Sequence, residues 1–182
     1  MKKLSSIFFL CLIFILFSSC ERPDLTGDVE YAYDVAKNNA CSEEIDGYMW
    51  SPKASSIMNW SDSIDYCNNL TACGYSDWHL PTISELRTLI QNCSRNEMPS
   101  GTCGVRDDDE VVCLESSCWT SETCGFCSSD SSDKYSKFGE TGWFWSSSTR
   151  SDKTDHAWLV DFYNGDVNNY DKINVYNVRC VR

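Results

Sequence analysis

The fold is decided by the stretch Gly74-Tyr75-Ser76-Asp77-Trp78-His79-Leu80-Pro81-Thr82-Ile83-Ser84-Glu85-Leu86. Thr82 and Glu85 stand at the spacing of a capping box, in which each side chain accepts a hydrogen bond from the other residue's backbone N–H. Pro81 stiffens the backbone just before this cap. Apolar side chains follow at helical spacing, at Ile83, Leu86, Leu89 and Ile90. The pattern predicts a helix after Pro81 whose apolar face packs into a core.

An earlier helix is predicted immediately after Asn59. Asn59 is a favourable N-cap, and apolar residues recur at helical spacing from Trp60 through Ile64 and Cys67. This periodicity turns Cys67 toward the core. Before the helix, residues 45–50 have the composition of a strand.

The C-terminal part of the chain has the patterns of β-strands. Asn164-Gly165 is a strong signal for a hairpin turn, and Trp158, Val160 and Phe162 alternate along the strand before it. The predicted strands are residues 144–148, 156–163, 167–170 and 175–181. Two helices followed by an antiparallel meander predict an α+β domain, spanning residues 41–182.

Residues 1–19 have the features of a bacterial lipoprotein signal peptide. Lys2 and Lys3 precede an apolar run, residues 7–17, which is shorter than the roughly 20 residues of a membrane-spanning helix. Small residues then lead to Cys20, the predicted site of lipidation. A diacylglycerol on Cys20 and an acyl chain on the new N-terminus would anchor the protein, with residues 20–40 as a tether. We therefore expect a location in the cell envelope, at the outer membrane or cell surface.

The charge balance narrows the range of partners. After removal of the signal peptide, 27 acidic side chains face 13 basic ones, a formal charge of −14. This excess of negative charge argues against nucleic acid, sulfated glycans and anionic membrane surfaces as partners. The partners that remain are the membrane, contacted through the lipid anchor, and a surface glycan or a protein.

Ten cysteines remain besides Cys11 and Cys20, and an even number in an exported chain predicts disulfides. Six of them lie in residues 91–142, a polar insertion without clear periodicity. We expect this insertion to be held by disulfides among its own cysteines rather than by packing. Cys124 and Cys127 form a CxxC motif, but the sequence lacks the accompanying motif that a redox or zinc role for this pair would need. The six are Cys93, Cys103, Cys113, Cys118, Cys124 and Cys127.

Five segments resemble the Lcl C-terminal domain family, a bacterial domain of unknown function. They are residues 59–70, 74–86, 144–148, 157–165 and 178–182, preceded by Met49-Trp50, in the family's order and spacing. The resemblance covers residues 45–182 apart from the insertion.

The resemblance implies a C-type-lectin-like fold, distantly similar to that of formylglycine-generating enzymes. It also implies a disulfide between Cys67 and Cys180, because a bridge from the first helix to the last strand is common in such folds. Cys41 with Cys73 is a further pairing that we consider. His79 stands where both families usually have Arg, which weakens any inherited role that needs a guanidinium.

Three groups of residues are candidates for function. Tyr163, Tyr170 and Tyr176 surround the late hairpin, where they would contact a sugar or protein partner, although cross-strand packing also explains them. The acidic run offers oxygen ligands for Ca²⁺, but a solvated loop explains it equally. This run comprises Asp107, Asp108, Asp109 and Glu110. His79 and His156 are too few for a histidine-rich metal site, and neither lies beside a nucleophile.

The expected function is therefore a lipid-anchored, non-catalytic binding or adhesion module without a cofactor. One alternative is an enzyme of the formylglycine-generating type, which would need a cysteine pair able to bind copper. Another is a purely structural protein of the envelope.

Overall fold

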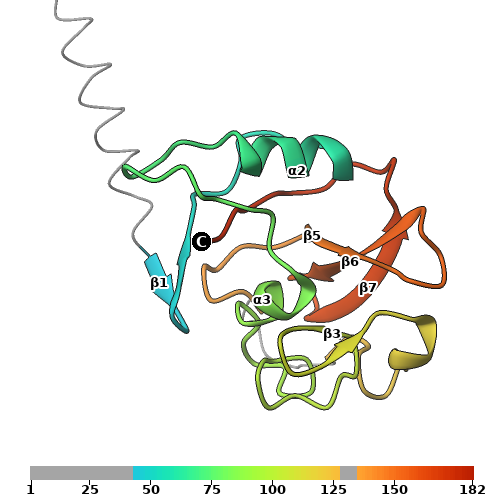
Figure 1. Cartoon of the computed structure of the whole chain (residues 1–182). Helices are drawn as coiled ribbons and strands as arrows, with labels where there is room; N and C mark the ends of the chain where they lie inside the picture. Colours follow the sequence, from blue (N-terminus) through green and yellow to red (C-terminus); the bar gives the residue numbers. More distant parts are fainter. Residues whose placement is uncertain (1–42, 128–134) are drawn as a thin grey trace, which may run out of the picture. The chain divides into compact units, whose positions relative to one another are not determined.

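The computed structural model describes residues 43–127 and 135–182 (Figure 1). All of them belong to one unit of the chain. The predicted signal peptide, Cys20, the tether and Cys41 lie outside the described residues. In the part of the chain that is described, no helix combines the length and the apolar character needed to cross a membrane.

The described chain is α+β, as predicted. Its helices are α2 (Trp60–Asn68), α3 (Ile83–Arg87) and a 3-10 turn, Ser116–Cys118. Its short hairpins are β1 (Glu43–Ile45) with β2 (Tyr48–Trp50), and β3 (Arg106–Asp107) with β4 (Val112–Cys113). The main sheet is antiparallel and runs in the order β5 (Trp143–Thr149), β6 (His156–Asp161), β7 (Asp166–Asp171).

Both predicted helices are present, with the predicted caps. The Asn59 side chain accepts a hydrogen bond from the backbone N–H of Asp62, 2.9 Å away. The Thr82 hydroxyl accepts from the Glu85 N–H at 3.2 Å, while the Glu85 carboxylate accepts from the Thr82 N–H at 2.8 Å. These caps satisfy backbone donors that would otherwise lack partners at the helix starts.

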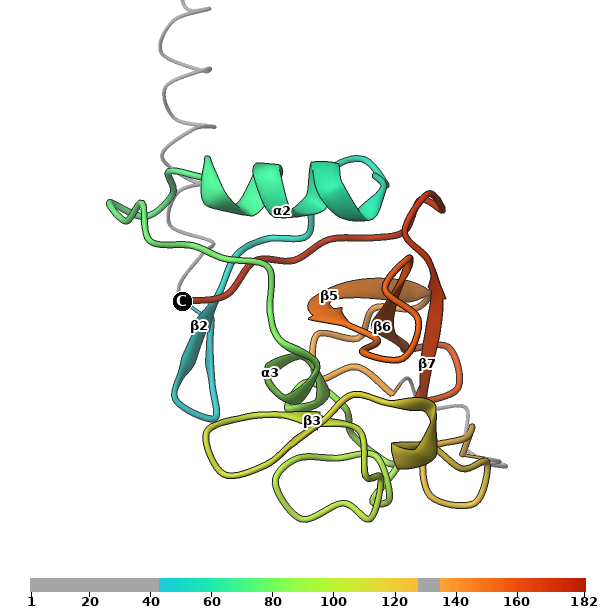
Figure 2. The ribbon, with the colours of Figure 1, turned by 45° about the vertical axis from the view of Figure 1, so that its right-hand side comes forward.

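The three-stranded sheet is covered on both faces. On one face Trp145 and Leu159 pack together with Cys67 of α2, and on the other face Phe144 and Trp158 pack with α3 and the insertion. Figures 1 and 2 show α2 on one side of the sheet and α3 with the insertion on the other. Because neighbouring residues of a strand point to opposite faces, one short sheet supplies both cores.

Residues 45–50 are a hairpin rather than the single strand that we predicted. Asp46 and Gly47 have φ values of 53° and 84°, as the two central residues of a type I′ turn require. The Asp-Gly pair was a turn signal within an otherwise strand-like composition. The resulting β1–β2 pairing is antiparallel, with Ile45 opposite Tyr48.

Two predicted strands have other boundaries or other partners. β6 ends at Asp161, and residues 162–165 form a four-residue turn instead of a two-residue one. Residues 175–181 do not form a regular strand. They make isolated bridges, including Tyr176 with Met58 and Val181 with Trp50. This segment changes its neighbour every few residues, so no continuous ladder forms.

The disulfides join the elements as the cysteine count suggested. Cys67 and Cys180 are bonded, with an S–S distance of 2.07 Å and 113 residues between them in sequence. The six cysteines of the insertion pair among themselves, as 93–127, 103–124 and 113–118. Cys73 is also disulfide-bonded.

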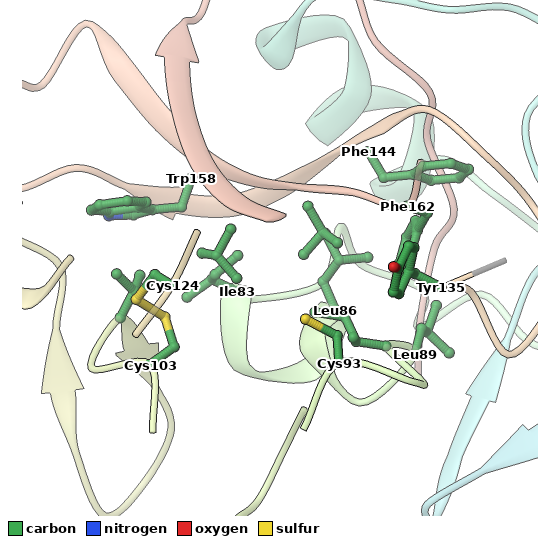
Figure 3. Close-up of a cluster of buried hydrophobic side chains, with 14 of the residues drawn as sticks. Ile83, Leu86, Leu89, Cys93, Cys103, Cys124, Tyr135, Phe144, Trp158 and Phe162 are labelled. Atoms are coloured by element: carbon green, nitrogen blue, oxygen red, sulfur yellow. A yellow bond between two sulfur atoms is a disulfide. The ribbon is translucent and has the colours of Figure 1, made fainter. Parts of the chain in front are cut away.

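The expectation that the insertion is not packed is wrong. Val105 is fully buried, and Cys103–Cys124 lies beside Ile83 and Trp158 in the core (Figure 3). The fully buried Arg87 of α3 holds the insertion by donating hydrogen bonds to its backbone carbonyls. Its acceptors are Asn96, Cys103 and Val105. Burial lowers the pKa of Arg87 to about 10.

Candidate functional site

The turn between β6 and β7 carries an exposed aromatic residue, Tyr163, and the segment of the insertion that bonds to this turn carries another, Phe126. The Tyr163 side chain is 75% exposed and that of Phe126 is 63% exposed, the two highest values for aromatic residues in the described ranges. The backbone N–H of Cys127 donates to the Asn164 carbonyl at 2.9 Å, which places the two segments side by side. We call Phe126, Tyr163, Asn164 and Asp166 the hairpin-tip surface.

The backbone under this surface is held from several directions. Cys124 and Cys127 flank Phe126, and both are bridged to other parts of the insertion. The buried amide of Asn96 donates to the carbonyls of Cys124 and Gly165, at 3.1 and 2.6 Å. Such a backbone fixes the positions from which the two exposed side chains project before any ligand arrives, which lowers the entropic cost of binding.

Gly165 shows how closely the two segments approach. Its φ is +72°, and a Cβ added there would lie 3.0 Å from the Cys93 sulfur. Only glycine combines the left-handed backbone with this close contact. Gly165 is therefore needed both for the turn and for the close packing of the insertion against it.

A pair of carboxylic acids lies at the base of the tip, because Asp161 and Asp166 are directly opposite each other across the β6–β7 ladder. Asp161 is 5% exposed and accepts hydrogen bonds from the Tyr163 N–H at 2.9 Å and from the Trp143 side chain. One oxygen of Asp166 accepts from Asn168 at 3.2 Å, and the other is buried without a hydrogen-bond partner among the described residues.

This environment favours the neutral form of both acids. Burial is the main cause that raises the pKa of Asp166 to about 6, and the nearby Asp161 adds to it. Burial also raises the pKa of Asp161. Near pH 6 the Asp166 carboxyl is therefore half protonated and acts as both hydrogen-bond donor and acceptor.

The structure brings together Tyr170 and Tyr176 but separates Tyr163 from them. The ring of Trp143 lies 4.4 Å from that of Tyr170 and 5.2 Å from that of Tyr176, and Trp145 lies 4.8 Å from Tyr176. Tyr170 and Tyr176 are partly buried and pack against the core. Their rings contact other aromatic rings from β5, so aromatic packing rather than ligand binding accounts for their positions.

The acidic run, residues 107–110, is bound to protein groups. The Asp107 carboxylate accepts from the Ser148 hydroxyl at 2.5 Å. Asp108 pairs with Arg106 at 3.0 Å and accepts from the backbone N–H of Glu110 and Val111. These contacts form a side-chain-capped turn, and they lower the pKa of Asp108 against the effect of burial. The residues thus do not converge as a set of calcium ligands.

His79 pairs with the carboxylate of the α3 cap. Its Nε2 lies 3.2 Å from both oxygens of Glu85. This hydrogen bond raises the pKa of His79, and it lowers that of Glu85 despite burial. An imidazole thus contacts the capping box where the family resemblance led us to expect Arg.

Sequence reasoning missed a cluster of residue types that commonly serve as metal ligands. Asp155, His156 and Asp171 place ligand atoms within 4.8 Å of one another. A two-residue turn at Asn164-Gly165 would have set Ile173 opposite His156. The observed turn is longer and pairs His156 with Asp171 instead.

Phe126 was also missed, because its position depends on the disulfides of the insertion.

In comparisons with known proteins, the model of a family described as the Lcl C-terminal domain matches residues 39–182. The comparison with curated proteins gives no match.

Proposed function

We propose that this chain, which belongs to the Lcl C-terminal domain family, is a non-catalytic module that binds an uncharged carbohydrate through the hairpin-tip surface. The observation that carries the proposal is the pair of exposed rings, Phe126 and Tyr163, on backbone held by disulfides and by Asn96. Covering exposed aromatic rings with a ligand removes apolar surface from water, and a rigid backbone lowers the entropic cost of that binding.

The chemistry of the surface fits a sugar. Aromatic ring faces stack on the C–H faces of pyranose rings, while amide and carboxyl groups bond the sugar hydroxyls. Asn164 supplies an amide beside Tyr163, with the carboxyl of Asp166 beneath it, and a few placed polar groups within an apolar site are typical of small-ligand recognition. The formal charge of −14 without the leader opposes anionic glycans.

A protein partner fits the tip less well. A stable protein interface covers about 800 Å² on each partner, whereas the exposed apolar groups at the tip are two rings. The exposed aliphatic side chains lie on other segments, at Ile57, Val111, Val112, Ile173 and Val175. We therefore favour carbohydrate over protein as the ligand.

The proposed fold is C-type-lectin-like. The bridge from α2 to Cys180 and the central antiparallel sheet support it. The nine cysteines in the described ranges are all disulfide-bonded, so none there offers a thiol pair to copper, which supports a non-catalytic module over the enzyme alternative. The proposed location is the bacterial envelope through lipid on Cys20, supported by the leader and by a disulfide-rich domain. If Cys20→Ala still partitions with membranes, the anchor is elsewhere.

The carbohydrate proposal is tested on an array of neutral and anionic glycans. We expect binding to neutral glycans that falls at least tenfold in Tyr163→Ala and in Phe126→Ala, since anchor residues cost more than about 1 kcal/mol when truncated. Tyr75→Ala is the matched control, because Tyr75 is also exposed but its ring lies under the Arg182 guanidinium, 3.5 Å away. Binding confined to anionic glycans or to proteins, or unchanged by Tyr163→Ala, would overturn the proposal.

A further inference from the structure

We propose that Asp155, His156 and Asp171 form a binding site for a divalent transition-metal ion. Their ligand atoms lie within 4.8 Å of one another. The carbohydrate proposal uses none of these residues, so the metal site stands independently of it.

The sheet fixes the three ligands relative to one another. His156 begins β6 and lies directly opposite Asp171, the last residue of β7. The Asp155 carbonyl accepts a hydrogen bond from the backbone N–H of Lys172 at 2.9 Å. The ligands therefore come from one end of a single pair of strands, where the ladder holds their backbones.

The hydrogen bonds of His156 leave it in the form that binds metal. Its Nε2 lies 2.6 Å from the Lys153 ammonium, which is able only to donate. Nε2 therefore has the lone pair, and Nδ1 carries the proton and donates to Oδ1 of the Asn169 side chain, 3.0 Å away. Metal-binding histidines are commonly oriented in this way, by an oxygen acceptor on the nitrogen that does not bind the metal.

Lys153 places a positive charge beside the imidazole of His156. Its ammonium rests on the lone pair that a metal ion would use. Lys153 is exposed and lies in the turn between β5 and β6, so its side chain is free to move into solvent. A doubly charged ion gains more from two carboxylates than a single ammonium does. Lys153 is thus a competitor whose removal should favour the metal.

The donor set points to Zn²⁺ or a similar ion. One imidazole and two carboxylates are a mixed nitrogen and oxygen set, which suits transition metals better than Ca²⁺ or Mg²⁺. In a tetrahedral site with bonds of about 2.0–2.2 Å, neighbouring ligand atoms lie about 3.3–3.6 Å apart, so closing the site requires the three side chains to approach one another by up to about 1.5 Å. Three protein ligands leave a position for water.

The experiment titrates chelator-treated, non-reduced full-length protein in detergent with ZnCl₂, followed by calorimetry and thermal melting. We expect one Zn²⁺ per chain and a higher Tm. His156→Ala and Asp171→Asn should each weaken binding at least tenfold, and Lys153→Met should strengthen it. His79→Ala is the matched control, because the chain has two histidines and His79 is the one outside the proposed site. This variant should bind Zn²⁺ as the wild type does.

Several results would overturn the site. They are the absence of saturable one-to-one binding, His156→Ala binding as tightly as wild type, or His79→Ala losing binding. Circular dichroism establishes that each variant is folded. Lys153→Met keeps every ligand and changes an exposed turn, so it tests the site even where a ligand variant unfolds. Unchanged or weaker Zn²⁺ binding in Lys153→Met counts against the proposal.

Discussion

The scaffold and the cysteine-rich insertion are stabilised by different means. In the scaffold, residues 43–90 and 143–182, apolar side chains fill both sides of a sheet, and one long-range disulfide joins α2 to the C-terminal segment. In the insertion, three shorter disulfides combine with buried polar side chains that bind backbone carbonyls. The main examples are Arg87, which reaches into the insertion from α3 of the scaffold, and Asn96 of the insertion itself, each with an exposure of 0%.

This difference shows why a polar segment is able to join a core. The carbonyls of an irregular loop cannot pair with one another as those of a sheet do, so buried ones need donors from side chains. Arg87 and Asn96 supply these donors to several carbonyls each. The hairpin-tip surface lies where the two regions meet. The scaffold contributes the turn between β6 and β7, and the insertion contributes a loop held by disulfides.

The largest effect is expected from the bridge that closes the scaffold. Replacing Cys67 and Cys180 together by Ala should cost about 5 kcal/mol of unfolding free energy, because the bridge closes a loop of 113 residues. The same change at Cys113 and Cys118, five residues apart, should cost about 2 kcal/mol. Denaturant unfolding checks both values. Equal losses would show that loop length does not distinguish the two regions.

A smaller effect is expected at the polar centre of the insertion. Arg87→Met should cost about 3 kcal/mol, since it leaves buried carbonyls without donors. Limited proteolysis should then cleave the insertion before the scaffold. Arg95→Met is the matched control, because the Arg95 side chain bonds the Glu122 carbonyl at the surface, and it should change stability by less than about 0.5 kcal/mol. Cleavage of the scaffold first would contradict this division.

The junction of the two regions should respond to pH. The native state of Asp166 holds its proton up to about pH 6, whereas an ordinary Asp loses it near 3.8. Ionised Asp166 therefore destabilises the fold as pH rises from 4 to 7. Asp166→Asn should be more stable than wild type by about 2 kcal/mol at pH 8 and nearly equal to it at pH 4. Thermal melting at the two pH values checks this, and an equal difference at both would contradict it.

The smallest effect is expected at the start of α2. Asn59→Ala removes the N-cap acceptor and should cost about 1 kcal/mol, measured by denaturant unfolding. Asn59→Ser retains a capping oxygen and should recover most of that loss. If Asn59→Ser is as destabilised as Asn59→Ala, the cap does not explain the effect.

Local signals were read correctly from the sequence. Asn59 and the Thr82–Glu85 pair predicted both helices, because caps and periodicity act within a few residues. The sheet was predicted from alternation and from Asn164-Gly165. The Asp46-Gly47 turn was equally local, and we overlooked it inside an apolar run.

Features that depend on register or on buried polar groups were not predicted. The turn length after Asp161 sets which residue lies opposite His156, so the sequence alone did not show that Asp171 does. The role of Arg87 was not predicted, because apolar periodicity says nothing of buried hydrogen-bond donors. Of the candidate site, Tyr163 was predicted, whereas Phe126 depends on disulfide pairings that sequence alone does not give.

The most direct test of the hairpin-tip surface compares two tyrosines in one calorimetric experiment. A neutral oligosaccharide bound by the wild-type protein is titrated into Tyr163→Ala and into Tyr170→Phe. Our account predicts at least a tenfold loss of affinity for Tyr163→Ala and wild-type affinity for Tyr170→Phe, whose ring stays packed on Trp143. Full affinity in Tyr163→Ala together with a loss in Tyr170→Phe would move the binding site to the packed aromatic cluster and contradict the account.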